Sequence, residues 1–113
     1  MYLYIELWKA RPKWLALSLQ ERTDYLLKAG HSIQSILDEV GVDFFSVLND
    51  PDISHQIDYR YINLWKMPNR ALVRQLEEAV EQAGWHRYFE QVNAGGEIVS
   101  LEAIFGEVLN RKS

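Results

Sequence analysis

The stretch YLYIELWK at residues 2–9 recurs as YRYINLWK at residues 59–66, 57 positions further along the chain. Six of the eight positions are identical, and Glu6 in the first copy corresponds to Asn63 in the second. In both copies aromatic side chains alternate with aliphatic ones, and a period of two predicts a β-strand with two different faces. The repeat therefore predicts two equivalent strands, each with an aromatic and an aliphatic side.

Helix caps mark the segments that follow the two strands. Ser18 and Glu21 form the pattern of a capping box, and the apolar stripe behind it predicts a helix over residues 19–40. Gly30 lies within that stripe, where close approach of the helix to a sheet would offset its low helix propensity. Asn69 predicts the N-cap of a second helix. One long helix is thus expected after each copy of the repeat.

Two further strands and a short helix complete the pattern. Residues 42–48 are β-branched and aromatic, residues 86–94 form a less regular strand, and Gly95–Gly96 predicts the turn after it. Ser100 predicts the cap of a short C-terminal helix. The order β-α-β-β-α-β plus a helix predicts a single ferredoxin-like α+β domain over residues 1–113. In this topology the repeated strands lie side by side at the centre of an antiparallel sheet.

The two faces of the central strand pair differ in character. We expect the aliphatic face to lie beneath the helices; it consists of Leu3, Ile5, Leu7, Ile62 and Leu64. The aromatic face carries Glu6, Asn63 and the rings of Tyr2, Tyr4, Trp8, Tyr59, Tyr61 and Trp65. These rings amount to several hundred Å² of largely apolar surface, which is more than soluble monomers usually leave in water. We therefore expect the aromatic face to be covered.

Three alternatives could cover the aromatic face. The C-terminal helix could fold over it, although a short helix would shield only part. A nucleic acid could stack on the rings, as on RNA-recognition motifs of the same topology, but the net charge of −4 and the missing RNP1 pattern disfavour this. A second copy of the sheet could close a homodimer through this sheet face. We expect the homodimer, and Trp65→Ala should then weaken it.

Composition excludes several classes of protein. The chain has 113 residues, of which 48% are hydrophobic, as is usual for one globular domain. No apolar run approaches the roughly 18 residues of a spanning helix, so a cytoplasmic protein with no membrane partner is expected. The absence of cysteine excludes disulfides, zinc-thiolate sites and cysteine nucleophiles.

Several segments resemble an uncharacterised family within the dimeric α+β barrel superfamily. The likeness is carried by the aromatic first strand, by WLALSLQER at residues 14–22 and by GWHRYFEQVNAGGE at residues 84–97, and it spans nearly the whole chain. The resemblance implies a sheet-to-sheet dimer. The superfamily includes cofactor-free monooxygenases of aromatic polyketides, chlorite dismutase-like haem enzymes, muconolactone isomerases, YCII-like proteins and stress-related proteins. The resemblance identifies no catalytic residue in this chain, because a shared fold is a weak guide to chemistry.

Glu6 and Asn63 are the candidate catalytic residues. A carboxylate walled by aromatic rings suits proton transfer, while Asn63, with Gln91 or Asn93 from the neighbouring strand, would orient a bound polar group. The alternative role is structural: Glu6 would accept hydrogen bonds from Tyr hydroxyls or Trp N–H groups, or pair with an arginine across the dimer. Both roles predict a partly buried carboxylate.

A pocket for a small apolar or aromatic ligand is predicted beside these two residues. Its lining is expected to be Tyr4, Trp8, Tyr59, Tyr61, Trp65, Gln91 and Asn93. The alternative is plain interface packing, in which aromatic residues are also enriched. No cofactor is expected, and a haem is disfavoured because no histidine is predicted on the cavity face.

The loop at residues 49–58 holds the remaining candidate ligands for a cation. His55 shares it with Asp50, Asp52 and Asp58, an oxygen-and-nitrogen set that a divalent cation could use. Aspartate is also common in turns, and no metal-ligand spacing is met. No metal site is therefore predicted.

Two classes of function follow. The first is a small-molecule protein, either a cofactor-independent enzyme of the monooxygenase or isomerase kind or a ligand binder, that uses Glu6 and Asn63. The second is a non-catalytic homodimer whose aromatic face is entirely an interface. An enclosed cavity lined by polar and aromatic groups would favour the first class.

Overall fold

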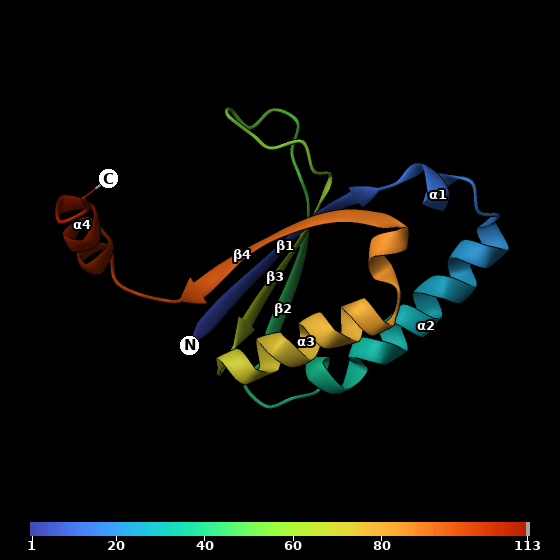
Figure 1. Cartoon of the computed structure of the whole chain (residues 1–113), viewed down its shortest axis with the longest axis horizontal. Coiled ribbons are helices and arrows are strands. Elements are labelled where there is room, and N and C mark those ends of the chain that lie inside the picture. Colours follow the sequence, from blue (N-terminus) through green and yellow to red (C-terminus); the bar gives the residue numbers. More distant parts are fainter. Residues whose placement is uncertain (113) are drawn as a thin grey trace.

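The computed structural model describes residues 1–112 and shows a four-stranded antiparallel sheet with two long helices on one face (Figure 1). The strands are β1 (Tyr2–Ala10), β2 (Asp43–Leu48), β3 (Tyr61–Met67) and β4 (Phe89–Glu97). The helices are α1 (Pro12–Leu15), α2 (Leu19–Leu37), α3 (Arg70–Gln82), the 3₁₀ turn η1 (Trp85–Arg87) and α4 (Leu101–Leu109). This arrangement confirms the predicted ferredoxin-like α+β fold.

The repeated strands β1 and β3 are neighbours at the centre of the sheet, in the order β2-β3-β1-β4. Their antiparallel register places Glu6 opposite Asn63, and it pairs Tyr4 with Trp65 on one side and Trp8 with Tyr61 on the other. The repeat equates Tyr4 with Tyr61 and Trp8 with Trp65, so these two pairs are equivalent. An approximate two-fold axis therefore passes between Glu6 and Asn63.

The predicted helix caps are present. The Ser18 side chain accepts a hydrogen bond from the Glu21 N–H at 3.1 Å while the Glu21 carboxylate accepts one from the Ser18 N–H at 2.9 Å, which completes a capping box. Asn69 caps α3 and Ser100 caps α4 through similar side-chain bonds. These bonds fix where α2, α3 and α4 begin.

The prediction that Gly95–Gly96 forms a turn is wrong. Both glycines lie within β4, where Gly95 pairs with Tyr4 and Gly96 with Leu3 of β1. A Cβ atom at position 95 would lie 2.5 Å from the Leu3 carbonyl oxygen, so glycine is required by close approach of the two strands.

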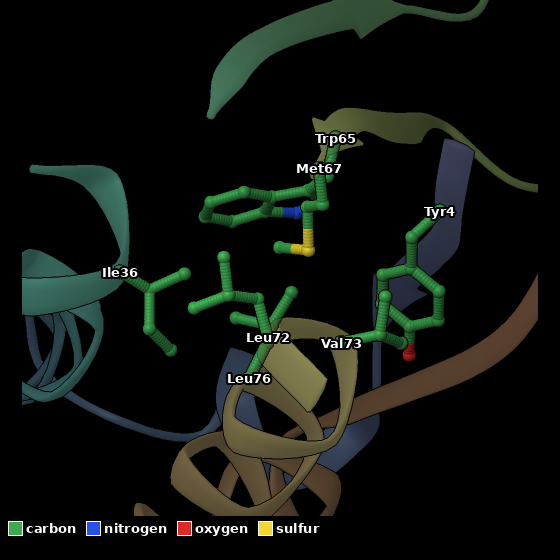
Figure 2. Close-up of a cluster of buried hydrophobic side chains, with 7 residues drawn as sticks. All are labelled: Tyr4, Ile36, Trp65, Met67, Leu72, Val73 and Leu76. Carbon is green, nitrogen blue, oxygen red and sulfur yellow. The ribbon is translucent and has the colours of Figure 1, made fainter. Parts of the chain in front are cut away.

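The prediction that the aliphatic face lies beneath the helices is also wrong. The aromatic face is the one that α2 and α3 cover, and Trp65 is only 1% exposed there. Figure 2 shows the resulting core, in which side chains from the sheet and from both helices converge. Its buried members are Tyr4, Ile36, Trp65, Met67, Leu72, Val73 and Leu76.

The aliphatic face is therefore the open one. Leu3, Ile5, Leu7, Ile62 and Leu64 lie on the side of the sheet away from α2 and α3, where the edge strands add Phe45, Val47 and Val92. Phe45 is 59% exposed, and both Val47 and Val92 are 44% exposed. We call this surface the open sheet face.

A second aromatic cluster closes the end of the domain near α1 and η1. Trp14 of α1 is buried, and its ring centroid lies 4.7 Å from that of Phe89. Phe89 also stacks on Trp85 at 4.1 Å, and Trp85 contacts Trp8 edge to face. The cluster holds Trp85 against the sheet. None of the helices within residues 1–112 has the length and apolar character needed to cross a bilayer.

Candidate functional site

Glu6 lies at the middle of β1 on the face that the helices cover. The alternation of the strand fixes this direction, because Tyr4, two residues earlier, belongs to the core on the same face. Glu6 is 4% exposed, and among residues 1–112 it is more buried than Asn49, the other buried polar residue. Charged side chains are almost never fully buried unless they are paired.

Three neutral donors hold the Glu6 carboxylate. Its Oε1 atom accepts hydrogen bonds from Trp65 Nε1 at 2.7 Å and from Asn63 Nδ2 at 3.3 Å, and Oε2 accepts one from Gln91 Nε2 at 3.0 Å. Within residues 1–112, Glu6 takes part in none of the ion pairs. The carboxylate is thus solvated by the protein's amides and indole and is not neutralised by a cation.

Each donor is itself oriented by another bond. Gln91 Oε1 accepts from Trp85 Nε1 at 2.8 Å, so the amide must turn its Nε2 toward Glu6. Asn63 Oδ1 accepts from the Ser46 hydroxyl at 3.2 Å, which directs its Nδ2 in the same way. Two tryptophans, two amides, one hydroxyl and one carboxylate therefore form a connected network across all four strands and η1.

Tyr4 is affected by this environment. Burial raises the pKa of the Tyr4 hydroxyl well above its ordinary value, and the negative charges of Glu6 and Glu77 raise it further. The Tyr4 phenol is therefore neutral at physiological pH and serves as part of the wall beside Glu6.

A cavity of about 200 Å³ opens next to Glu6, between the sheet and the two long helices. Glu6, Asn63 and Trp65 line it from the sheet, and Trp85 closes one end. The helices contribute mainly small or aliphatic side chains, namely Leu26, Ala29, Gly30, Ile33, Leu76, Ala79, Val80 and Ala83. Because Leu26 is 46% exposed, the cavity reaches the surface beside α2.

A smaller hollow of about 90 Å³ meets Glu6 from the other side of α3. It is polar, since its lining includes His86, Gln91 and Asn93 as well as two glutamates of α3. His86 Nε2 lies 3.7 Å from Glu81 Oε2 at the rim of this hollow. Glu6 thus borders an apolar cavity on one side and a polar hollow on the other.

The structure brings some of the predicted site residues together and not others. Glu6, Asn63, Trp65 and Gln91 share one hydrogen-bond network, and Asn93 joins it only through Gln91, at 2.8 Å. Tyr4 lines the smaller hollow together with Gln91 and Asn93.

The other three predicted pocket residues lie away from the cavity. Trp8 and Tyr61 pack against each other, with ring centroids 4.5 Å apart, and line neither of the two spaces described. Tyr59 precedes β3 and donates a hydrogen bond to Glu90 Oε2 at 3.0 Å, with Lys9 above its ring. Trp8 and Tyr61 are the pair that the approximate two-fold axis relates to Trp65 and Tyr4.

The helical half of the cavity was not anticipated from the sequence. Gly30 was expected to allow close approach of α2 to the sheet, yet a Cβ atom there would have nothing within 4 Å. Gly30, Ala29, Ala79 and Ala83 leave space where larger residues would fill it. A run of small residues on the inner stripes of both helices was the signal that could have located the cavity.

The loop between β2 and β3 is organised by an amide. Asn49 is 9% exposed, and its Nδ2 atom donates to the carbonyl oxygens of Ile57 and Tyr59 at 3.2 and 2.9 Å. In the described part of the chain, no group of three His, Asp or Glu side chains is placed to hold a metal ion. The aspartates of this loop instead serve its turns and edges, as when Asp50 Oδ1 accepts from the Asp52 N–H.

A haem does not fit the main cavity. Among the described residues that line it there is no histidine, cysteine, methionine or tyrosine that could serve as an axial ligand. The lining is suited to a smaller molecule with few polar groups.

These features define a small α+β domain of the ferredoxin-like kind with a buried, uncompensated carboxylate at the edge of an apolar cavity. The chain belongs to the family of unknown function DUF6616, whose model matches residues 1–111. This confirms the resemblance to an uncharacterised family inferred from the sequence. No match was found among the curated proteins.

Solved structures resemble the chain in fold. A chlorite dismutase from Candidatus Nitrospira defluvii, determined in complex with imidazole, aligns with a TM-score of 0.70 at 17% identity over 94% of this chain and 43% of that one. A dabb family protein from Mesorhizobium loti with a ferredoxin-like fold aligns with a TM-score of 0.57 at 15% identity over 88% of this chain and 97% of that one. The chain spans less than half the length of the chlorite dismutase. At these identities the likeness shows the fold alone.

Proposed function

We propose that the protein binds a small, largely apolar molecule in the cavity between α2 and α3, and that Glu6 exchanges a proton with it. The observation that carries this proposal is a carboxylate that is 4% exposed, is held by three neutral N–H donors and faces an apolar cavity. A buried charge without a cation is costly unless it is fully hydrogen-bonded or neutralised. A ligand that presents an N–H, O–H or acidic C–H group would complete the site.

The chemistry that this arrangement supports is general acid–base catalysis. A carboxylate accepts a proton from a substrate carbon and can return it to another, which is an isomerisation that needs no cofactor. Removal of the same proton is also the first step by which a cofactor-independent monooxygenase would prepare its substrate. Asn63 and Gln91 hold the carboxylate in place, and the described lining on the helical side of the cavity is made of small or aliphatic side chains. If no proton is transferred, the same geometry would allow Glu6 to hold the ligand by a hydrogen bond alone.

The size of the cavity limits the ligand. An apolar cavity of about 150 Å³ accommodates benzene. The space of about 200 Å³ beside Glu6 is therefore suited to one substituted ring or a branched chain of similar bulk. The ligand's donor group would face Glu6 and its apolar part would contact Ile33, Leu76 and Val80.

Gly30 offers a direct test of this proposal, because a side chain added there would point into open space. Gly30→Leu should fill the cavity and prevent binding, whereas Gly30→Ala should leave room and raise the stability of α2 by about 1 kcal/mol through helix propensity. Native mass spectrometry of protein purified from its own host should show a bound small molecule on the wild type and on Gly30→Ala but not on Gly30→Leu.

Phenol provides a defined probe for the same comparison. Ligand-observed NMR should detect phenol binding to the wild type and Gly30→Ala, with at least tenfold weaker binding to Gly30→Leu. Equal binding by all three proteins would place the ligand elsewhere and remove the cavity from the proposal.

We also propose a homodimer through the sheet, formed by the open sheet face and not by the aromatic face expected from the sequence. The support is the apolar character of that face, which carries aliphatic side chains from β1 and β3 and the exposed Phe45, Val47 and Val92 of the edge strands. Soluble monomers rarely leave such a contiguous surface in water. Two copies related by a two-fold axis would cover both surfaces at once.

Phe45→Asp is the variant that tests the dimer. Phe45 is 59% exposed in the single chain, so the substitution should not unfold the domain. Burial of a carboxylate in an apolar interface should instead shift the protein to a monomer in sedimentation velocity at micromolar concentration. Val40→Asp, at a position that is 91% exposed beyond the end of α2, is the matched control and should remain dimeric. A Phe45→Asp protein that sediments like the wild type would contradict this interface.

A further inference from the structure

The C-terminal helix α4 stands apart from the rest of the domain (Figure 1). Within residues 1–112 it makes no extensive contact with any other helix or strand. Its apolar side chains are nevertheless numerous: Leu101, Ile104, Phe105, Val108 and Leu109 are 48–83% exposed. Most of the apolar surface of this helix is therefore uncovered in the described part of the chain.

Because α4 extends away from the sheet, the molecule is longer than a compact domain; we call α4 and the residues that connect it to β4 the arm. The radius of gyration is 16.4 Å, whereas a compact domain of this length has a value of roughly 13 Å. Hydrogen bonds continue to the base of the arm, since the Ile98 N–H donates to the Met1 carbonyl at 2.9 Å. Ser100 then caps α4, so three residues separate the end of β4 from the start of the helix.

A helix of nine residues is not stable in water on its own propensity. Its formation requires an apolar surface to pack on. The same chain supplies such a surface, because the open sheet face is uncovered and Phe45 and Val47 of its β2 edge are 59% and 44% exposed. The central strands β1 and β3 are already half-buried by their neighbours, so the β2 edge, with Phe45 and Val47, is the part that most lacks cover.

We propose that α4 is an exchange arm, which packs on the β2 edge of the open sheet face of a second copy of the chain. A reciprocal exchange covers two apolar helices and two apolar edges at once and closes as a two-fold dimer, with no surface left for further copies. The inference rests on the sheet-face dimer proposed above and adds which element completes it. In the isolated chain, α4 and the β2 edge lie at opposite borders of the sheet, because α4 follows β4 in the order β2-β3-β1-β4.

Disulfide trapping tests the exchange cleanly because the chain contains no cysteine. Full-length Phe105→Cys and Val47→Cys proteins are purified separately, mixed to allow subunit exchange, and oxidised. A covalent heterodimer of twice the chain mass is expected. Ala103→Cys, about 160° away around α4 from Phe105, is the matched control. Its yield with Val47→Cys should be at least tenfold lower.

The remaining outcomes separate the possible errors. If the mixture gives no heterodimer and a Phe105→Cys/Val47→Cys double variant forms a disulfide within one chain, α4 packs on its own sheet and the proposal is wrong. If Phe105→Asp leaves the dimer affinity unchanged and no crosslink forms in either experiment, α4 has another role while the sheet-face dimer stands. If Phe45→Asp has no effect on sedimentation, both the dimer and the exchange fail.

Discussion

Trp65→Ala should lower the free energy of unfolding by about 3–5 kcal/mol, as expected for loss of a large buried aromatic side chain. Trp65 is 1% exposed at the centre of the core beneath α2 and α3, and its ring lies 4.4 Å from that of Phe44. The substitution also removes the 2.7 Å hydrogen bond to Glu6 and leaves that carboxylate with two donors. Domains of this size are stable by only about 5–15 kcal/mol, so urea unfolding will resolve the loss.

Trp65→Phe separates the loss of packing from the loss of the hydrogen bond, and Phe45→Ala is the control on the other face of the sheet. Trp65→Phe keeps an aromatic ring but has no N–H group, so it should lose about 1.5–3 kcal/mol, the range for a hydrogen bond to a charged acceptor. Phe45→Ala, on the open sheet face, should change the stability of the single chain by less than about 1 kcal/mol because the side chain is already 59% exposed. A Trp65→Ala protein as stable as Phe45→Ala would show that the aromatic face is not the core.

Glu6→Gln should abolish most of the function while keeping the fold. If Glu6 is the base, the rate of turnover should fall by about 10²–10⁴-fold, which is the usual contribution of general acid–base catalysis. If the protein only binds, affinity for a donor ligand such as phenol should fall by about tenfold or more, because a charged acceptor is lost. Ligand-observed NMR and, once a substrate is known, steady-state kinetics measure these effects.

Glu6→Gln should also lower the stability of the fold, and this effect has to be separated from its effect on binding. A glutamine amide at this position would face the Nε2 of Gln91, so Gln91 would have to rotate and give up its bond from Trp85. We expect a stability loss of about 1–2 kcal/mol from this change. Glu78→Gln, on the exposed side of α3, is the matched control and should affect neither binding nor stability. Retention of wild-type phenol affinity by a folded Glu6→Gln protein would remove Glu6 from the site.

The topology could be predicted from the sequence because local signals determine it. Alternation in the repeat, the capping box at Ser18 and the cap at Asn69 each depend on neighbours within a few residues. The choice between the two sheet faces depends on the helices instead. Large apolar side chains of the helices, such as Ile36 and Leu76, pack with Trp65 of the aromatic face in the buried core, and this contact between layers cannot be read from the strand pattern.

The part of the site that could be predicted is the part carried by the strands. Register alone places Glu6 opposite Asn63, and the neighbouring strand adds Gln91 on the same face. The cavity could not be located in this way, because it lies between layers whose spacing no strand pattern specifies. The role of Gly95 could not be predicted for a similar reason. Glycine is required there because the Leu3 carbonyl of the neighbouring strand β1 lies too close for a side chain, and not because the chain turns.

The central claim is most directly tested by a crystal structure of the protein purified from its own host. The account predicts electron density for a small non-water molecule in the cavity beside Trp85 and Leu76, with a donor group within hydrogen-bond distance of a Glu6 oxygen. A cavity that holds only ordered water, or that is closed by the side chains of Leu26 and Ile33, would contradict it.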